Sequence, residues 1–390
     1  MSTKAIRPHS HHHLHAIREL LRHIGEFAKK NMVLCIALCA AALTSLIVPP
    51  DAKYIEYFDF KTLTCLFCIL AVVCALKDVR FFEIIAQRIV ALTGATRPAV
   101  LALVYITFIG SMLIANDMAL LTFLPLGYYV LSSTGKERYM AFTFIMQNIA
   151  ANLGGMLTPF GNPQNLYIYT RFSIPTLEFM SIMFMPFIVS VLLITLCCLF
   201  VKNEPIELSS GIKGERIRWK KTSVYLVLFA YSIAIVFHSV PYWTGLVLIP
   251  ASLLFLDREA LKKVDYPLLL TFTAFFIFSG NMARIEVVRE FFSHLLSKST
   301  LVFSVLSCQL ISNVPSAILL SEFTQDYAQL LRGVNIGGAG TLIASLASLI
   351  TFREYTKHFP EKTLKYIILF SVFNFAFAIL LTVICSIFPI

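Results

Sequence analysis

The chain has 390 residues and a formal net charge of +10, with 58% apolar or aromatic residues and only 14% charged residues. Soluble domains carry roughly 25% charged residues, because a soluble surface needs polar side chains to cover it. The composition therefore excludes a soluble enzyme, a disordered protein and a nucleic-acid-binding protein. It predicts an all-α polytopic membrane protein.

Residues 1–30 are polar and basic, and we interpret them as a cytoplasmic tail. Metal binding by the histidines of this tail is an alternative to a plain solvated segment. The apolar run Asn31–Pro50 is too long and starts too late for a cleaved signal peptide, so it is predicted to be the first span. The histidines of the tail are His9, His11, His12, His13 and His15.

Runs without Asp, Glu, Lys or Arg locate the later spans. A helix needs about 20 residues to cross a bilayer. Thr62–Leu76 is shorter, so its helix must extend at both ends, whereas Thr222–Leu256 holds two spans with a turn near residues 239–241. The other charge-free runs are Tyr139–Thr170, Tyr266–Ala283, Ser299–Ser321, Gly333–Phe352 and Tyr366–Ile390, and Phe172–Val201 contains only Glu178.

Three segments between the spans have a different character. Val79–Thr93 and Met282–Lys298 mix charged and large apolar residues at helical spacing, which favours helices lying in the membrane interface. Residues 202–221 form a basic cytoplasmic linker between a first transmembrane half, residues 31–201, and a second half, residues 222–390.

Two motifs occur once in each half and in the same order. Residues 113–122 read LIANDMALLT and residues 310–319 read LISNVPSAIL. Residues 152–166 read NLGGMLTPFGNPQNL and residues 335–349 read NIGGAGTLIASLASL. Chance similarity of apolar segments is the alternative to an internal repeat covering residues 62–201 and 264–390. Paired interruptions rich in Gly and Pro are typical of transporter binding sites, because broken backbone at membrane depth must line protein or a cavity.

The distribution of positive charge gives a topology. We place the N-terminus inside and treat Pro98–Leu131 and Ser299–Leu331 as re-entrant hairpins. The inside then holds 25 of the 32 Lys and Arg residues, as the positive-inside rule requires. This arrangement has about nine full spans and two hairpins, a C-terminus outside, and two repeats of inverted topology.

Asp117 is the only Asp, Glu, His, Lys or Arg residue between Arg97 and Lys136. A carboxylate at membrane depth is costly and needs a proton, a cation or buried donors, which makes it a candidate coupling group. The alternative is a cap for a helix that starts at Met118.

Asn116 and Asn313 stand at matched places beside the two breaks. Each offers an amide oxygen to a cation and N–H groups to an anion, although a structural turn would also explain them. The predicted core spans contain no Lys or Arg, so an anion would be held by helix N-termini and amides. This leaves a neutral solute or ions alone as alternatives. Other intramembrane amides are predicted to form interhelical hydrogen bonds: Gln147, Asn148, Gln309 and Asn374.

At these motifs the sequence resembles the ion transporter superfamily, which includes divalent anion:sodium symporters, citrate transporters, arsenite permeases and a class of sodium/proton antiporters. The matching pieces are residues 115–117 (AND), 158–165 (TPFGNPQN), 312–315 (SNVP) and 338–341 (GAGT) with Ser345. The Asp beside the first tip resembles the arsenite permease branch more than the symporters with Ser-Asn-Thr tips.

The resemblance implies that hairpin tips and helix breaks meet near the midplane and bind the ion and the solute. The residues carried over by motif are Asn116, Asp117, Thr158, Gly161, Asn162, Pro163, Ser312, Asn313, Gly340, Thr341 and Ser345. Sodium, where it is the coupling ion, would lie at Asn116, Asp117 and Asn313. The resemblance also implies elevator-like alternating access and a homodimer.

We therefore expect a secondary transporter of a small carboxylate or oxyanion in the cell membrane, coupled to Na⁺ or H⁺ and without a cofactor. A cation/proton antiporter of the same fold is the main alternative, and a channel is a further one. An intramembrane enzyme is disfavoured because no H-E-x-x-H or G-x-S-x-G motif is present.

Overall fold

The computed structural model describes residues 22, 25–27, 31–206 and 216–388. In these ranges the chain folds into helices and short turns, and its only extended pairing is an isolated bridge between Ala95 and Pro205. The predicted all-α fold is thus confirmed. The histidines of the N-terminal tail lie outside the described residues.

The helices follow the predicted spans. The first half holds α2 (Met32–Ile47), α3 (Phe60–Asp78), α4 (Phe81–Ala91), α5 (Thr96–Ile114), α6 (Asn116–Ser133), α7 (Met140–Gly154), α8 (Pro163–Arg171) and α9 (Thr176–Leu199). The second half holds α10 (Trp219–Val236), α11 (Tyr242–Leu256), α12 (Arg258–Lys262), α13 (Tyr266–Arg284), α14 (Glu286–Lys298), α15 (Thr300–Ile311), α16 (Asn313–Leu320), α17 (Tyr327–Ile336), α18 (Leu346–His358) and α19 (Thr363–Ile387).

The two halves share one order of elements. In the first, α3 is followed by the amphipathic α4, the hairpin α5–α6, the broken helix α7–α8 and α9. In the second, α13 is followed by the amphipathic α14, the hairpin α15–α16, the broken helix α17–α18 and α19. Helix α3 extends the short charge-free run Thr62–Leu76 at both ends, as expected.

Six helical stretches in the described part of the chain are long and apolar enough to cross a membrane. They are Phe60–Asp78, Thr96–Ile114, Thr176–Leu199, Trp219–Val236, Arg258–Arg284 and Pro360–Ile387. The shorter apolar helices α2, α11 and α15 add to this set. The chain is therefore a multi-pass membrane protein.

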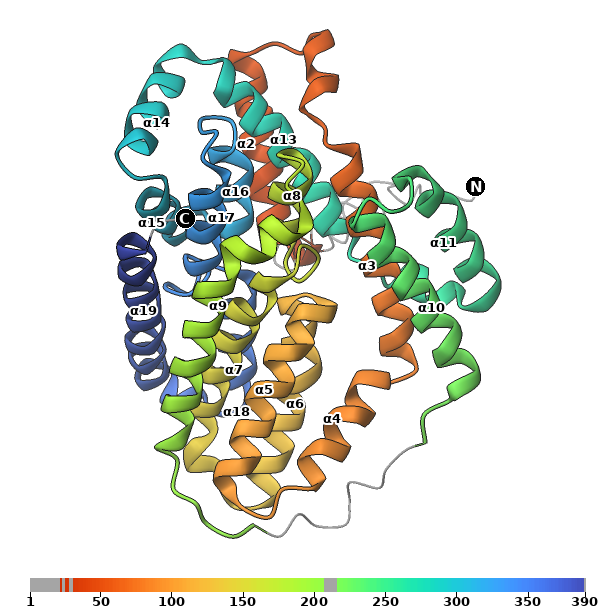
Figure 1. Cartoon of the computed structure of the whole chain (residues 1–390), viewed down its shortest axis with the longest axis vertical. Helices are drawn as coiled ribbons and strands as arrows, with labels where there is room; N and C mark the ends of the chain where they lie inside the picture. Colours follow the sequence, from red (N-terminus) through yellow and green to blue (C-terminus); the bar gives the residue numbers. More distant parts are fainter. Residues whose placement is uncertain (1–21, 23–24, 28–30, 207–215, 389–390) are drawn as a thin grey trace, which may run out of the picture.

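The two hairpins occupy opposite ends of the molecule. Helices α5 and α6 lie in its lower half, and α15 and α16 lie in its upper half (Figure 1). Helix α8 contacts α16 and α17, while α18 contacts α6 and α7. Each half-helix beyond a break therefore packs against the hairpin of the other half, and the two broken helices run antiparallel.

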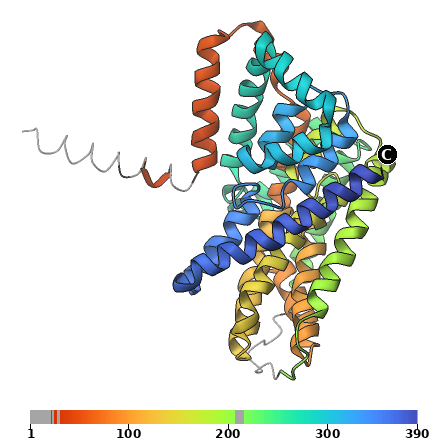
Figure 2. The same ribbon diagram turned by 90° about the vertical axis from the view of Figure 1, so that its left-hand side faces the viewer.

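A second group of helices stands beside this body. Helix α2 packs on α13 at the edge of the molecule (Figure 2), and α10 and α11 pack on α3. Helices α3 and α13 also contact α8 and α16, respectively, and so join the two groups.

The second hairpin is shorter than predicted. Its return arm α16 has eight residues and ends at Leu320, and a new helix begins at Tyr327. The Asp326 side chain accepts a hydrogen bond from the Gln329 backbone N–H at 3.1 Å and so caps this new helix. The predicted hairpin range to Leu331 was therefore too long.

The segment that follows α9 forms hydrogen bonds with the residues at the start of the first hairpin. The Thr96 backbone N–H donates to the Glu204 carbonyl at 2.8 Å, and the Ile206 N–H donates to the Gly94 carbonyl at 3.1 Å. Hydrogen bonds from Lys136, at 2.7 Å, and from Arg138 hold the pKa of the Glu204 carboxyl below its usual range. The start of the predicted linker is thus part of the hairpin body.

The predicted topology can be tested by labelling single cysteines in a variant without the native cysteines. Ser133 ends the first hairpin and Ser297 precedes the second, and both are exposed. We prefer Ser297 to Ser299, because the Ser299 side chain caps α15. Ser133→Cys should react from the cytoplasmic side and Ser297→Cys from the outer side. Reaction of both from one side would contradict inverted repeats.

Candidate functional site

Both hairpin tips have the same unusual backbone. Ala115 has φ 65° and ψ 155°, and Ser312 has φ 74° and ψ 160°. This region is populated almost only by glycine and costs a larger residue of order 1–3 kcal/mol. Such strain persists only where the surroundings impose it, so the two tips are held in one specific conformation.

The tip asparagines cap the return arms in matching ways. Asn116 Oδ1 accepts from the Asp117 backbone N–H at 2.9 Å, and Asn313 Oδ1 accepts from the Val314 backbone N–H at 2.9 Å. Both asparagines are buried. Helix α6 therefore begins at Asn116, and Asp117 Oδ1 is without a hydrogen-bond partner among the described residues. This geometry counts against the interpretation of Asp117 as a helix cap.

Each break is joined to the hairpin of its own half by a threonine. Thr158 Oγ1 donates to the Met112 carbonyl at 3.1 Å, and Thr341 Oγ1 donates to the Gln309 carbonyl at 3.3 Å. Both carbonyls lie four residues before a tip asparagine. The two threonines thus have equivalent places in the two halves.

The half-helices after the breaks also begin alike. Asn162 precedes α8 with φ −140° and ψ 146°, and Ser345 precedes α18 with φ −148° and ψ 151°. Pro163 follows as the first residue of α8, where its missing N–H costs nothing. Four helices therefore begin at the tips and breaks, namely α6, α8, α16 and α18.

Glycines allow these parts to approach closely. A Cβ added at Gly338 would lie 3.2 Å from Asn313 Nδ2 and 3.5 Å from Asn152 Oδ1. Asn152 Oδ1 in turn accepts from Asn116 Nδ2 at 3.3 Å. The tips of both hairpins therefore meet around Asn152 and Gly338 in the centre of the protein.

Gly154 gives a stability prediction. A Cβ at this position would lie 2.4 Å from the Phe108 carbonyl oxygen, which is backbone and cannot move aside. Gly154→Ala should destabilise the protein by about 1–3 kcal/mol. Gly94→Ala is the matched control, because no atom lies within 4 Å of its Cβ position. Thermal unfolding in detergent should show a lower midpoint only for Gly154→Ala, and equal midpoints would contradict this packing.

The two halves differ at their tips. In the second half, the Asn313 backbone N–H donates to the Ala344 carbonyl at 2.9 Å and docks the tip on its break. Gly161 is the matched position in the first half, and the described residues show no corresponding bond from Asn116 to it. Asp117 is half-buried, and its Oδ1 is buried with no hydrogen-bond partner in the ranges that the structure describes. The first half-site therefore carries the ionisable group and lacks the backbone bond between tip and break.

All the predicted site residues lie at the tips and breaks, in two matched groups. Asn116, Asp117, Thr158, Gly161, Asn162 and Pro163 form the first group, and Ser312, Asn313, Gly340, Thr341 and Ser345 form the second. Gly340 has φ 148°, a conformation that a larger side chain rarely adopts, and its Cβ position lies 2.1 Å from Gln309 Oε1. Whether these residues bind an ion or a solute stays a prediction.

The intramembrane amides form interhelical bonds, as predicted. Asn148 Nδ2 donates to Asn374 Oδ1 at 3.2 Å, and Gln309 Nε2 donates to the Gly337 carbonyl at 2.9 Å. Gln147 Nε2 donates to Thr107 Oγ1 at 3.0 Å.

Sequence reasoning missed the amides that cross between the breaks. Asn335 Nδ2 donates to Asn165 Oδ1 at 2.6 Å, and Gln164 Nε2 lies 3.5 Å from Asn335 Oδ1. These residues stand inside the two matched motifs, so the motifs could have indicated them.

Arg332 falls between two predicted segments, Ser299–Leu331 and Gly333–Phe352, and the structure buries it. It lies on α17 and is only 4% exposed. Its Nε donates to the Ile182 carbonyl at 3.1 Å and its Nη1 to the Phe388 carbonyl at 3.1 Å. The guanidinium thus binds the C-terminal end of α19, where a cation is favourable.

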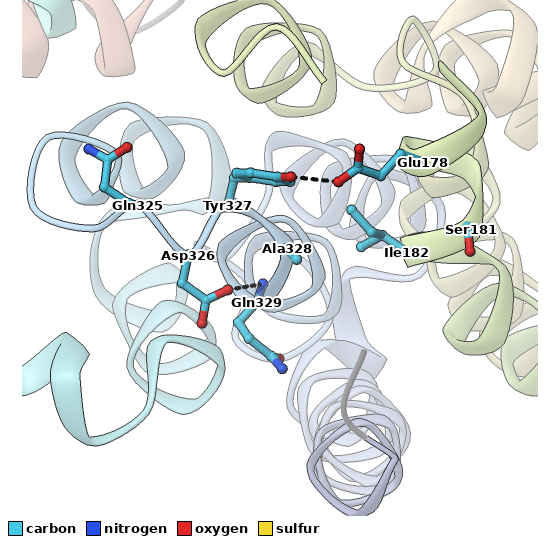
Figure 3. Close-up of a pocket in the computed structure, with 8 residues that line it drawn as sticks. All are labelled: Glu178, Ser181, Ile182, Gln325, Asp326, Tyr327, Ala328 and Gln329. Atoms are coloured by element: carbon cyan, nitrogen blue, oxygen red, sulfur yellow. Dashed lines mark hydrogen bonds between the residues drawn. The ribbon is translucent and has the colours of Figure 1, made fainter. Parts of the chain in front are cut away.

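A separate pocket of about 460 Å³ lies between the N-terminal end of α9 and the start of α17 (Figure 3). In it, Tyr327 Oη donates to Glu178 Oε1 at 2.5 Å. None of the predicted site residues lines this pocket. Its lining consists of Glu178, Ser181, Ile182, Gln325, Asp326, Tyr327, Ala328 and Gln329.

Comparison with known families decides the class of the protein. The family model described as citrate transporter matches residues 24–333, which is most of the chain, all of the first repeat and about half of the second. The chain belongs to the citrate transporter family. This family is part of the ion transporter superfamily that the motifs resemble, so the predicted family is confirmed.

Curated relatives agree with this assignment. The chain is 32% identical over 312 residues to an uncharacterized transporter of Methanocaldococcus jannaschii, covering 80% of this chain and 85% of that protein. It is 29% identical over 285 residues to the inner membrane protein YbiR of Escherichia coli, covering 70% of this chain and 74% of that protein. This citrate transporter family member is accordingly a membrane transporter.

Proposed function

We propose that the protein is a secondary active transporter that carries a small carboxylate or oxyanion across the cell membrane, coupled to Na⁺ or H⁺. The observation that carries this proposal is the meeting of both hairpin tips at Asn152 and Gly338, beside the starts of four half-helices. The family and its relatives support transport of a solute. The geometry supports a central site shared by the two halves.

An anion fits this centre because helix N-termini carry partial positive charge and N–H groups without intrahelical partners. Helices α6, α8, α16 and α18 all begin there. The coupling step belongs to Asp117, whose unpartnered Oδ1 can take a proton or bind a cation. An anion and a cation are therefore bound by different groups of one site.

The arrangement of helices supports elevator-like movement. Hairpins and broken helices form one body, and α2, α3, α10, α11 and α13 stand beside it. Contacts of α8 with α3 and of α16 with α13 join the two groups. Movement of the hairpin body along α3 and α13 would carry the central site between the two faces of the membrane.

Reconstitution in liposomes tests this function. Purified full-length protein should accumulate a radiolabelled carboxylate or oxyanion against its gradient when an inward Na⁺ or H⁺ gradient is imposed. Collapse of that gradient with an ionophore should abolish accumulation. Failure of a panel of small anions to accumulate under either gradient would contradict the proposal.

A cation/proton antiporter is the second candidate. It is favoured by one observation: the unpartnered buried atoms at the first tip and break, including Asp117 Oδ1, are oxygens that suit a cation. This activity would exchange Na⁺ for H⁺ in the same vesicles without any organic solute or oxyanion. Fluorescence of a pH-sensitive dye inside the vesicles would detect it.

A further inference from the structure

Hydrogen bonds between the two breaks determine which way each side-chain amide faces, beginning with Asn165. Its Nδ2 donates to three backbone carbonyls, those of Gly155 at 3.0 Å, Thr158 at 3.3 Å and Met156 at 3.4 Å. Carbonyl oxygens only accept hydrogen bonds, so the amide nitrogen must face them. The Asn165 oxygen therefore faces the second broken helix.

The orientation of the Asn335 side-chain amide is determined in the same way. Its Nδ2 donates to the Leu331 carbonyl at 2.8 Å and to Asn165 Oδ1 at 2.6 Å. Asn335 Oδ1 is thereby turned toward the first break, where Asn162 Nδ2 lies at 3.4 Å and Gln164 Nε2 at 3.5 Å. Asn162 Nδ2 also donates to the Asn152 carbonyl at 3.4 Å. The side-chain nitrogens of Asn162 and Gln164 must therefore face these acceptor oxygens.

The side-chain oxygens of these two residues are left as acceptors without a donor among the described residues. Within the described part of the chain, Asn162 Oδ1 and Gln164 Oε1 are buried and have no hydrogen-bond partner, and each residue is only 1% exposed. A buried acceptor without a donor costs free energy, so such a pair calls for a partner from outside the protein. The contacts on the nitrogen side are long, at 3.4–3.5 Å.

The acceptor pair belongs to the first half alone. At the matched positions of the second break, the chain has Ser345 and Ala347. Ser345 Oγ accepts from the Ser348 backbone N–H at 3.2 Å. Gln164 and Asn162 therefore make the central site asymmetric, as Asp117 does at the tip.

We propose that Asn162 and Gln164 receive hydrogen bonds from the transported solute, which is a small anion that carries hydroxyl groups or acidic protons in addition to its charge. This inference rests on the proposed transport function. Helix N-termini donate to the charged oxygens of the solute, and the acceptor pair takes its O–H groups. An anion that only accepts hydrogen bonds leaves both oxygens unpaired.

Matched pairs of solutes test the inference. Malate differs from succinate, and citrate from tricarballylate, by one hydroxyl group. Binding to the purified full-length protein should favour the hydroxylated member of a pair by about tenfold or more, as expected for one hydrogen bond to a buried acceptor. Isothermal titration calorimetry gives both affinities and their ratio.

Two variants remove the acceptors. Gln164→Met keeps the length of the side chain, and Asn162→Ser introduces the residue type that precedes α18 at the matched position. One hydroxyl proton bonds only one acceptor at a time, so the double variant should reduce the hydroxyl preference to within about twofold, and the single variant that removes the bonded acceptor should weaken it. Gln147→Met is the control, because Gln147 Oε1 is also unpartnered but lies 2.9 Å from the Cβ position of Gly127, away from the breaks. It should keep the full preference.

An equal preference in wild type and in the double acceptor variant would overturn the inference. So would a loss of Na⁺ affinity in these variants with an unchanged solute ratio, because the oxygens would then bind the ion. If liposomes accumulate anions without any hydroxyl preference, this inference fails and the transport function stands. If no anion accumulates, both fail.

Discussion

Asp117→Asn is expected to abolish concentrative uptake while solute binding is partly retained. The substitution keeps the size of the side chain but removes the charge that can take a proton or bind Na⁺. Among the described residues Asp117 Oδ1 is buried without a partner, and the backbone N–H of Asp117 itself already donates to Asn116 Oδ1. The group therefore has no evident role in holding the helix. The matched residue in the second half, Val314, cannot ionise.

The measurement compares uptake with binding. Proteoliposomes with Asp117→Asn should equilibrate solute without accumulating it, and the pH or Na⁺ dependence of binding should flatten. Asp59→Asn is a suitable control, because Asp59 caps α3 at 2.9 Å from the Thr62 backbone N–H and lies away from the tips. Accumulation with unchanged ion dependence in Asp117→Asn would place coupling elsewhere.

The parts of the fold that the sequence predicts are those with a local cause. Runs without charge mark the helices, and Gly and Pro mark where the broken helices stop. The paired motifs at residues 113–122 and 310–319 become tips with the same backbone at Ala115 and Ser312. Repetition of a motif makes such a prediction possible, because each copy supports the interpretation of the other.

The parts that the sequence does not predict depend on contacts between distant segments. The direction of the amides follows from Asn335 reaching Asn165 across the two breaks, 170 residues apart. The burial of Arg332 follows from its position against the end of α19. The early end of the second hairpin is an exception, because it follows from a local cap at Asp326, which lies inside the predicted range. None of these contacts has a periodic signal in the chain.

Asn116→Ala and Asn313→Ala should each abolish transport and leave the fold largely intact. Asn116→Ala leaves the Asp117 backbone N–H and Asn152 Oδ1 without partners, and Asn313→Ala does the same to the Val314 backbone N–H. A buried group left unpaired costs about 1–3 kcal/mol, which the many contacts of the hairpins can absorb. The site itself loses an amide that no other residue replaces.

Asn281→Ala separates this effect from a general loss of stability. Asn281 is as buried as the tip residues and donates to Thr44 Oγ1 at 3.3 Å, but it joins α13 to α2 outside the hairpin body. All three variants should unfold at similar temperatures, whereas only the tip variants should lose uptake. Because the two tips have equivalent places, we expect losses of similar size from both. Wild-type uptake by either tip variant would mean that this asparagine only forms the turn. Solute binding would then depend on the residues of the breaks alone.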